Sequence, residues 1–428
     1  MARETVAQKI LARAAGTRHA QVGEVLDCRV DLAMSHDNAA LVARLFRELG
    51  LPRVWDPEKI VIPFDHRWPA PDETAAASHR AVRLFVNDVG IRHFYDGGVG
   101  ICHQVLPEKG HVRPGELIVG TDSHTCTYGA FGAFATGIGA TEMAAVWATG
   151  KLWLMVPESF RVQCDGDFPR HVMSKDLILR LIGDLGLDGA DYRSVEFHGP
   201  TFQRMSVASR MTVANMSMEM GAKAGVLLPD PKTFDWLEAR TPPPYAPVYP
   251  DEEAAYEREF HYDVSALEPQ VACPPEVDNV RPVSEIARQE LRVDQVYFGT
   301  CTNGRIEDLQ VAADLLRGER VAKGVRMLVT PASAEVFLEA RRLGLLETLM
   351  DAGALVQNPG CGACLGAHQG ILAGGERAIT TTSRNYRGRM GSKDAEIYLA
   401  SPATAAASAL YGVITDPRET GRKVSVVA

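Results

Sequence analysis

The chain has 428 residues, of which 46% are hydrophobic and 23% charged, and its formal net charge is −9. Two or three domains are expected, because this length exceeds that of one ordinary domain. The acidic balance argues against nucleic acid as a partner, since phosphate binding needs a basic surface. A membrane is not expected either, because no apolar run reaches the roughly 20 residues that span a bilayer.

The N-terminal segment, MARETVAQKILARAAG, lacks the apolar stretch of a secretory signal and predicts an amphipathic helix. We therefore expect a cytoplasmic protein. The eight cysteines do not predict a disulfide framework in that compartment. Three of them, Cys28, Cys164 and Cys273, are isolated in the sequence and are expected to be small buried apolar residues.

The N-terminal portion alternates strand-like runs (59–66, 91–98 and 116–124) with helical stretches such as 73–90. Polar residues follow these runs: Asp65 and His66, then His103 in GICHQV, then Asp122 and His124 in GTDSH. In parallel α/β sheets chemistry collects just beyond the carboxyl ends of the strands. An aspartate can orient a histidine and raise its basicity for acid–base work. One such pair is more often structural, but three histidines at strand ends favour a site.

Further along, TVANMSMEMGAK predicts a helix that carries Asn215 and Glu219 four residues apart, on one face. The stretch 240–275 is rich in proline and acid, and it predicts an extended connection. A C-terminal domain then begins near Val283. Its strand-like runs (293–299, 325–331, 354–360, 378–383 and 396–401) alternate with helical runs (305–318, 333–344 and 402–412), which predicts a largely parallel α/β sheet.

Three cysteines of this last domain form a constellation. Cys361 and Cys364 make a CxxC in NPGCGACLGAH, and Cys301 lies in GTCTNGR directly after a predicted strand. The set fits an iron–sulfur cluster, a zinc site or a redox dithiol. The dithiol is disfavoured because such pairs normally open a helix, and zinc would need a fourth ligand such as His368 or Cys126. Three cysteines alone leave one metal position open to substrate.

A basic run follows in SRNYRGRMGSK, with Arg384, Arg387, Arg389 and Lys393. The planar arginine side chain suits bidentate binding of a carboxylate. Such a run is usually a solvated loop, but the acidic chain and the glycine-rich spacing favour an anion site here.

Together, FDH, GICHQV, GTDSHTCTYGA, GTCTNGR, NPGCGACLG and TTSRNYRGRMG resemble the aconitase superfamily, over about residues 23–417. The similarity is closest to large subunits of 3-isopropylmalate dehydratase and of two-subunit homoaconitases. It implies three aconitase-like α/β domains, at 1–158, 159–282 and 283–428, with mostly parallel sheets around a central [4Fe–4S] cluster. The implied cluster ligands are Cys301, Cys361 and Cys364, and the fourth iron binds the substrate hydroxyl and a carboxylate.

The resemblance also implies roles for the polar residues. Asp65 and His66 help to protonate the departing hydroxyl, His103 interacts with Asp122, and His124 pairs with Glu219. The implied substrate-binding residues are Ser123, Asn215, Ser383, Arg384 and Arg389. Two positions depart from the family pattern: Ser383 stands where asparagine is common, and Asn38–Ala40 aligns near a substrate-touching glutamine or threonine–serine pair.

The implied reaction is the interconversion of 2-isopropylmalate and 3-isopropylmalate by dehydration and rehydration, in leucine biosynthesis. Homoaconitase of lysine synthesis and dimethylmalate dehydratase are alternatives, and all of these substrates are small di- or tricarboxylates. Outside enzymes, an iron-responsive RNA-binding protein or a structural zinc protein remains open. Because the chain ends soon after the third implied domain, we expect a separate small subunit, a swivel domain that carries the catalytic base.

Overall fold

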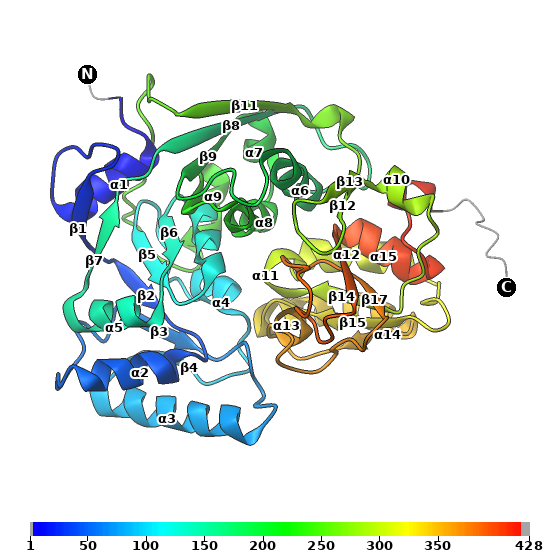
Figure 1. Cartoon of the computed structure of the whole chain (residues 1–428), viewed down its shortest axis with the longest axis horizontal. Coiled ribbons are helices and arrows are strands. Elements are labelled where there is room, and N and C mark those ends of the chain that lie inside the picture. Colours follow the sequence, from blue (N-terminus) through cyan, green and yellow to red (C-terminus); the bar gives the residue numbers. More distant parts are fainter. Residues whose placement is uncertain (1–2, 421–428) are drawn as a thin grey trace.

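The computed structural model describes residues 3–420. Residues 1–2 and 421–428, at the outer ends of the expected first and third domains, lie outside the described residues. Figure 1 shows three α/β regions around a common centre, with the first third of the chain on the left, the middle at the top and the last third on the right. No helix among the described residues is long and apolar enough to cross a membrane.

The first region holds a five-stranded sheet of order β4-β3-β2-β5-β6, in which all neighbouring strands are parallel. The strands are β2 (Leu32–Met34), β3 (Ile60–Pro63), β4 (His93–Tyr95), β5 (Leu117–Gly120) and β6 (Phe134–Gly137). The helices are α2 (Ala39–Glu48), α3 (Glu73–Val89), α4 (Cys102–Glu108), α5 (Ala140–Thr149) and the 3₁₀ segment η1 (Ser123–Phe131). This arrangement places the carboxyl ends of β2, β3 and β5 side by side.

The expected N-terminal helix is confirmed as α1 (Val6–Ala15). Thr5 and Gln8 form a reciprocal capping box at its start, and Gly16 ends it with a φ of 72°. Its apolar face, which includes Ile10 and Leu11, is buried. Beside it, β1 (Val25–Arg29) pairs antiparallel with β7 (Lys151–Met155).

The second region holds a four-stranded parallel sheet of order β10-β9-β8-β11. Its strands are β8 (Ser159–Asp165), β9 (Ser194–His198), β10 (Ala224–Leu227) and β11 (Arg258–Asp263). Its helices are α6 (Ser174–Leu185), α7 (Pro200–Arg204), α8 (Val207–Met216), η2 (Ser217–Met220), α9 (Pro231–Glu238) and η3 (Val264–Ala266).

The third region holds a seven-stranded sheet of order β13-β12-β18-β17-β14-β15-β16. It is parallel from β18 (Glu396–Ala400) through β17 (Arg377–Thr380), β14 (Gln295–Gly299), β15 (Arg326–Thr330) and β16 (Leu355–Val356), as expected. The short strands β12 (Gln270–Ala272) and β13 (Val280–Pro282) are antiparallel. The helices are α10 (Val283–Ala287), α11 (Thr300–Asn303), α12 (Ile306–Leu316), α13 (Ala334–Arg342), α14 (Leu345–Asp351), α15 (Pro402–Tyr411), η4 (Gly362–Leu365) and η5 (Pro417–Glu419).

The connection 240–275 is more structured than expected. It contains β11, which forms an edge strand on β8, and β12, which joins the third sheet. An edge position tolerates the charged and exposed side chains of β11. The division at 158/159 and 282/283 stays a prediction, and we note that β12 and β13 precede the second boundary but belong to the third sheet.

One apolar core joins the three regions. It includes Tyr128 of η1, Met216 of α8 and Tyr297 of β14, together with Cys301, Cys361 and Cys364. Of the isolated cysteines, Cys28 and Cys164 are buried as expected, whereas Cys273, which follows β12, is only partly buried. The cysteine constellation therefore lies where the three sheets meet.

Candidate active site

Asp122 lies at the centre of a group of histidines beyond the ends of β3 and β5. Its Oδ1 lies 2.9 Å from His103 Nε2 and accepts a hydrogen bond from the His124 amide at 2.7 Å. Its Oδ2 lies 3.1 Å from His66 Nε2. Burial alone would raise the pKa of Asp122, but the charge of His103 and hydrogen bonds from His103, His124 and His66 hold it well below its usual value. Asp122 is therefore a fixed anion.

His66 is held between two carboxylates. Its Nδ1 lies 2.6 Å from Asp65 Oδ1 and its Nε2 faces Asp122. Asp65 is fixed in turn by the Cys102 amide, which donates to its Oδ2 at 2.7 Å. Burial lowers the pKa of His66, but the neighbouring carboxylates, first Asp65 and then Asp122, raise it well above its usual value. This arrangement favours an imidazolium that carries a proton on each ring nitrogen.

Sequence reasoning missed two residues of this site, His36 and Asp37, which follow β2. The His36 ring stacks on the His66 ring, with centroids 3.9 Å apart. Asp37 accepts hydrogen bonds from the Asp65 amide at 2.9 Å and the His66 amide at 2.8 Å, so it fixes that backbone turn. The signal was present: SHDN also follows a buried strand of the same parallel sheet.

Glu219 joins the second and third regions to the site. Its Oε1 lies 2.8 Å from His124 Nε2 and accepts a hydrogen bond from Arg384 Nε at 2.8 Å. Its side chain is only 1% exposed. Burial raises the pKa of Glu219, but His124 and Arg384 more than offset this and lower it. The expected pair of His124 and Glu219 is thus in contact, with Arg384 as a third partner.

The expected single helix through Asn215 and Glu219 is wrong in detail. α8 ends at Met216, and Glu219 lies on the 3₁₀ segment η2. The Ser217 hydroxyl donates to Ala214 O at 2.7 Å, which competes with the helical hydrogen-bond pattern at this point. Asn215 still reaches the site, because its Nδ2 donates to Thr127 Oγ1 at 2.8 Å and lies 3.4 Å from Cys301 Sγ.

Cys301, Cys361 and Cys364 are buried and free of disulfides. Burial, and after it the charge of Cys364, raises the pKa of Cys301 to about 12, and burial raises that of Cys361 as well. Without a cation both groups are neutral thiols, and metal binding is the interaction that would stabilise their thiolates. Three soft donors in a buried setting, with an amide N–H directed at one sulfur, fit an iron–sulfur cluster.

The backbone around these cysteines is unusually constrained. Thr300, directly before Cys301, has a φ of 69°, which is rare for a β-branched residue. Arg305 holds the turn, since its guanidinium donates to Cys301 O at 2.6 Å and to Thr302 O at 2.8 Å. In the CxxC, Gly362 has a φ of 55° and a Cβ there would lie 2.4 Å from the Tyr297 hydroxyl. Only glycine fits that position.

The two residues considered as a fourth zinc ligand have other partners. His368 Nε2 lies 2.8 Å from Pro69 O, and Cys126 Sγ lies 3.3 Å from Asn215 O. These contacts favour a three-cysteine set over a closed tetrahedral zinc site.

The expected substrate-binding residues line the same region with different exposure. Ser383 is buried, whereas Arg384, Arg389 and Ser123 are half-buried. The Arg389 Nε is buried and has no hydrogen-bond partner among the described residues. Asn38, at one of the departing positions, contacts Thr121 beside Asp122 through its Oδ1 at 2.7 Å. Of the remaining basic residues, Arg387 is exposed.

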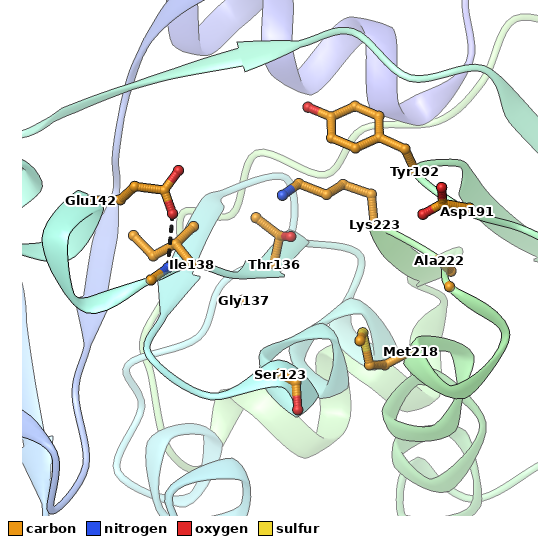
Figure 2. Close-up of a pocket in the computed structure, with 12 residues that line it drawn as sticks. Ser123, Thr136, Gly137, Ile138, Glu142, Asp191, Tyr192, Met218, Ala222 and Lys223 are labelled. Carbon is orange, nitrogen blue, oxygen red and sulfur yellow. Dashed lines mark hydrogen bonds between the residues drawn. The ribbon is translucent and has the colours of Figure 1, made fainter. Parts of the chain in front are cut away.

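A pocket of about 380 Å³ adjoins this cluster. Figure 2 shows Ser123 and Met218 on one side of it, with Lys223 extended between Glu142 and Tyr192 on the other. Ser123 follows Asp122 and Met218 precedes Glu219, so the pocket borders two segments of the site.

The aconitase family (aconitate hydratase) matches residues 8–412 of this chain. A 3-isopropylmalate dehydratase large subunit of Methanopyrus kandleri is 54% identical over 97% of this chain and 99% of its own. A probable methanogen homoaconitase large subunit of Methanosarcina mazei is 56% identical over 91% of this chain and 99% of its own. A probable 3-isopropylmalate dehydratase large subunit of Methanothermobacter thermautotrophicus is 53% identical over 96% of this chain and 98% of its own.

Proposed function

Because the chain belongs to the aconitase family, we propose that it is the large subunit of a 3-isopropylmalate dehydratase, a hydro-lyase of leucine biosynthesis. The enzyme interconverts 2-isopropylmalate and 3-isopropylmalate, with the cytoplasm as its expected compartment. The observation that carries this proposal is the contact of His66 with Asp65 and Asp122, close to three buried cysteines. The proposed acid and the proposed metal ligands therefore lie in one site.

Cys301, Cys361 and Cys364 hold the cofactor in this proposal. Members of the aconitase family bind an iron–sulfur cluster, and we assign a [4Fe–4S] cluster to these three residues. A cluster held by these three cysteines would keep a metal position open, and it would supply Lewis-acid stabilisation of the leaving hydroxyl group. The hydrogen-bond donor on Asn215 faces Cys301 Sγ and stabilises its thiolate form.

His66 is the proposed general acid. Asp65 holds its Nδ1, which leaves the proton on Nε2 for transfer to the departing hydroxyl group, while Asp122 stabilises the charged ring until then. His103 Nε2 and the His124 amide contact the other oxygen of Asp122, Oδ1, and so hold the carboxylate in its orientation toward His66. In the reverse direction, hydration, the same nitrogen takes a proton from water.

Arg384 and Arg389 are the proposed carboxylate-binding residues. Glu219 holds Arg384 at its Nε, so the two terminal nitrogens of that guanidinium remain for a substrate. The buried, unpartnered Nε of Arg389 is a donor that a carboxylate would satisfy. We assign Ser123, Asn215 and Ser383 to the remaining polar contacts with the substrate.

We propose that a small subunit completes the site, because the relatives named above are called large subunits. That partner, a swivel domain, contributes the base that removes the proton from the carbon next to the leaving hydroxyl group.

Homoaconitase is a second candidate, because a relative with that name is 56% identical to this chain. Its substrate carries a third carboxylate where isopropylmalate carries an apolar group. The departures at Ser383 and Asn38–Ala40 lie beside the arginine and histidine groups, so they bear on this choice. Dimethylmalate is a third substrate of the same chemical class.

The deciding experiment is a comparison of substrates with the anaerobically reconstituted pair of subunits. We expect kcat/KM for 3-isopropylmalate to exceed that for cis-homoaconitate by at least roughly tenfold, because a pocket for an apolar group leaves the third carboxylate unpaired. It should also exceed that for dimethylmalate, which fills less of an apolar pocket. A preference for cis-homoaconitate would assign the chain to the second candidate. Absence of all hydratase activity, with salt-sensitive RNA binding, would favour the iron-responsive alternative.

A further inference from the structure

Lys175, on the first turn of α6, is completely buried. Its Nζ donates hydrogen bonds to two consecutive backbone carbonyls, Thr381 O at 2.9 Å and Thr382 O at 2.6 Å. These carbonyls follow β17 and lead directly to Ser383 and Arg384. A buried ammonium group thus connects the second region to the loop that carries a proposed substrate arginine.

This ammonium group forms no ion pair with any carboxylate of residues 3–420. The adjacent Asp176 accepts hydrogen bonds from the Met173 amide at 2.8 Å and the Gln270 amide at 2.9 Å instead. An unpaired buried charge is strongly destabilising, and folded proteins normally compensate it with an anion. Carbonyl dipoles compensate the charge only in part, so a nearby anion would favour the ammonium form over the neutral amine.

As thiolate ligands of a bound cluster, the cysteines would supply that anion. Thr381 O accepts a second hydrogen bond, from the hydroxyl of Thr302, the residue that follows Cys301. Lys175 and the Cys301 turn therefore share one carbonyl oxygen. Burial lowers the pKa of Lys175 to about 7, and the groups that most oppose this are Cys301 and Cys364, ahead of Asp308 and Asp176.

We propose that Lys175 is a positioning residue that provides the buried positive charge for the cluster-bearing thiolates of Cys301 and Cys364 and holds the Thr381–Thr382 segment next to them. The inference rests on the proposed function, since it requires the cluster. With the cluster present, the ammonium group and the thiolates neutralise one another in a medium of low dielectric constant. The charge also lowers the energy of any more negative state of the cluster.

The test is the reduction potential of the cluster in the Lys175→Met variant, measured by anaerobic titration with detection of the reduced cluster by electron paramagnetic resonance. Net charge near an iron–sulfur cluster is one of the determinants of its potential. Removal of a nearby positive charge disfavours the added electron, so we expect a shift to more negative potential. Lys175→Arg, which keeps the charge, should restore the potential toward the wild-type value.

Lys232 is the matched control, because its Nζ also donates to a backbone carbonyl, Arg204 O at 2.6 Å, but it is exposed on α9. Lys232→Met should leave the potential unchanged. An unchanged potential in Lys175→Met would overturn the inference. If that variant takes up no cluster, thermal unfolding of the apoprotein tests the charge role of Lys175 instead. A melting temperature equal to or above that of the wild-type apoprotein supports the charge role, and loss of cooperative unfolding overturns it.

The cluster signal of the wild-type protein distinguishes failure of this inference from failure of the proposed function on which it rests. If the reconstituted wild-type protein shows no cluster signal, the proposed function fails and this inference fails with it. A normal wild-type cluster, with the variant at the same potential, contradicts the inference alone.

Discussion

At the scale of single residues, the site is organised by carboxylates that each serve more than one cationic or polarised partner. Asp122 contacts His66, His103 and the amide of His124. Glu219 contacts both His124 and Arg384. Because each anion is shared, a change at one imidazole leaves the other contacts in place, so acid catalysis can be separated from structure by mutation.

His66→Ala should lower turnover by roughly 10²–10⁴, the range for loss of a positioned acid. The cluster content should stay the same, because His66 is not among the three proposed ligands. Steady-state kinetics and iron determination on the same preparation measure both quantities. His198→Ala is the control, since His198 pairs with Glu196 in the second sheet, and it should retain activity. Parallel loss of cluster and turnover in His66→Ala would indicate a structural role instead.

Serine replacement of Cys301, Cys361 or Cys364 should abolish the visible absorbance of the cluster and the activity together. A serine oxygen is a harder and more basic ligand than a thiolate, so it binds iron poorly in this setting. Absorbance after anaerobic reconstitution is the measurement. Cys273→Ser, in a partly buried cysteine of the same region, should behave as wild type. A fully loaded and active Cys301→Ser protein would remove that residue from the ligand set.

The sequence indicated Asp65, His66 and Asp122 together, because they follow predicted strands of one parallel sheet and parallel strands bring such residues to one edge. His36, Asp37 and Lys175 were missed for a different reason. His36 and Asp37 do follow a strand of that sheet. Their stacking and backbone contacts, like the burial of Lys175 without an ion pair, nevertheless involve residues that lie far apart in the sequence. A single sequence does not encode such contacts in any local spacing.

At the scale of elements, a side-chain hydrogen bond and the pairing of strands determine secondary structure that the local sequence pattern did not predict. The helical spacing of Asn215 and Glu219 predicted that both side chains point toward one site, but the α-helix ends between them, where the Ser217 hydroxyl bonds to Ala214 O. In the connection 240–275, proline content predicted an irregular path. Pairing with β8 and with β18 nevertheless ordered two short segments as strands, because tertiary pairing outweighs local propensity.

An element-scale prediction concerns Glu116, which precedes β5. Burial, and after it the nearby Asp31, raises the pKa of Glu116 to about 7. The folded state therefore retains a proton that the unfolded state releases, and stability falls as the pH rises through that interval. Glu116→Gln removes this loss. The variant should be more stable than wild type by roughly 1–3 kcal/mol near pH 8 and equal to it near pH 4.

Urea unfolding at both pH values measures this difference, with exposed Glu48 on α2 as the site of a control substitution to glutamine. The control should change little at either pH. Equal stability of Glu116→Gln and wild type near pH 8 would mean that the carboxylate is solvated in the folded protein.

At the scale of the whole molecule, no single region contains the site. The first supplies Asp65, His66 and Asp122, the second supplies Asn215 and Glu219, and the third supplies the cysteines and arginines. The continuous core that joins Tyr128, Met216 and Tyr297 fixes these regions around the cysteines. A substrate that contacts all three regions therefore depends on the packing of this core.

We expect activity to require both subunits. The purified chain should hold the cluster but be nearly inactive, because the base is proposed to lie on the small subunit. Addition of that subunit should restore activity with saturation at a fixed ratio of the two chains. Titration at constant cluster content, followed by a hydratase assay, measures this directly. His66→Ala should bind the partner normally but gain little activity. Full activity of the chain alone would contradict the two-subunit proposal, and the base would then be sought among Ser123, Ser383 and Tyr386, which lie beside the arginine and histidine groups.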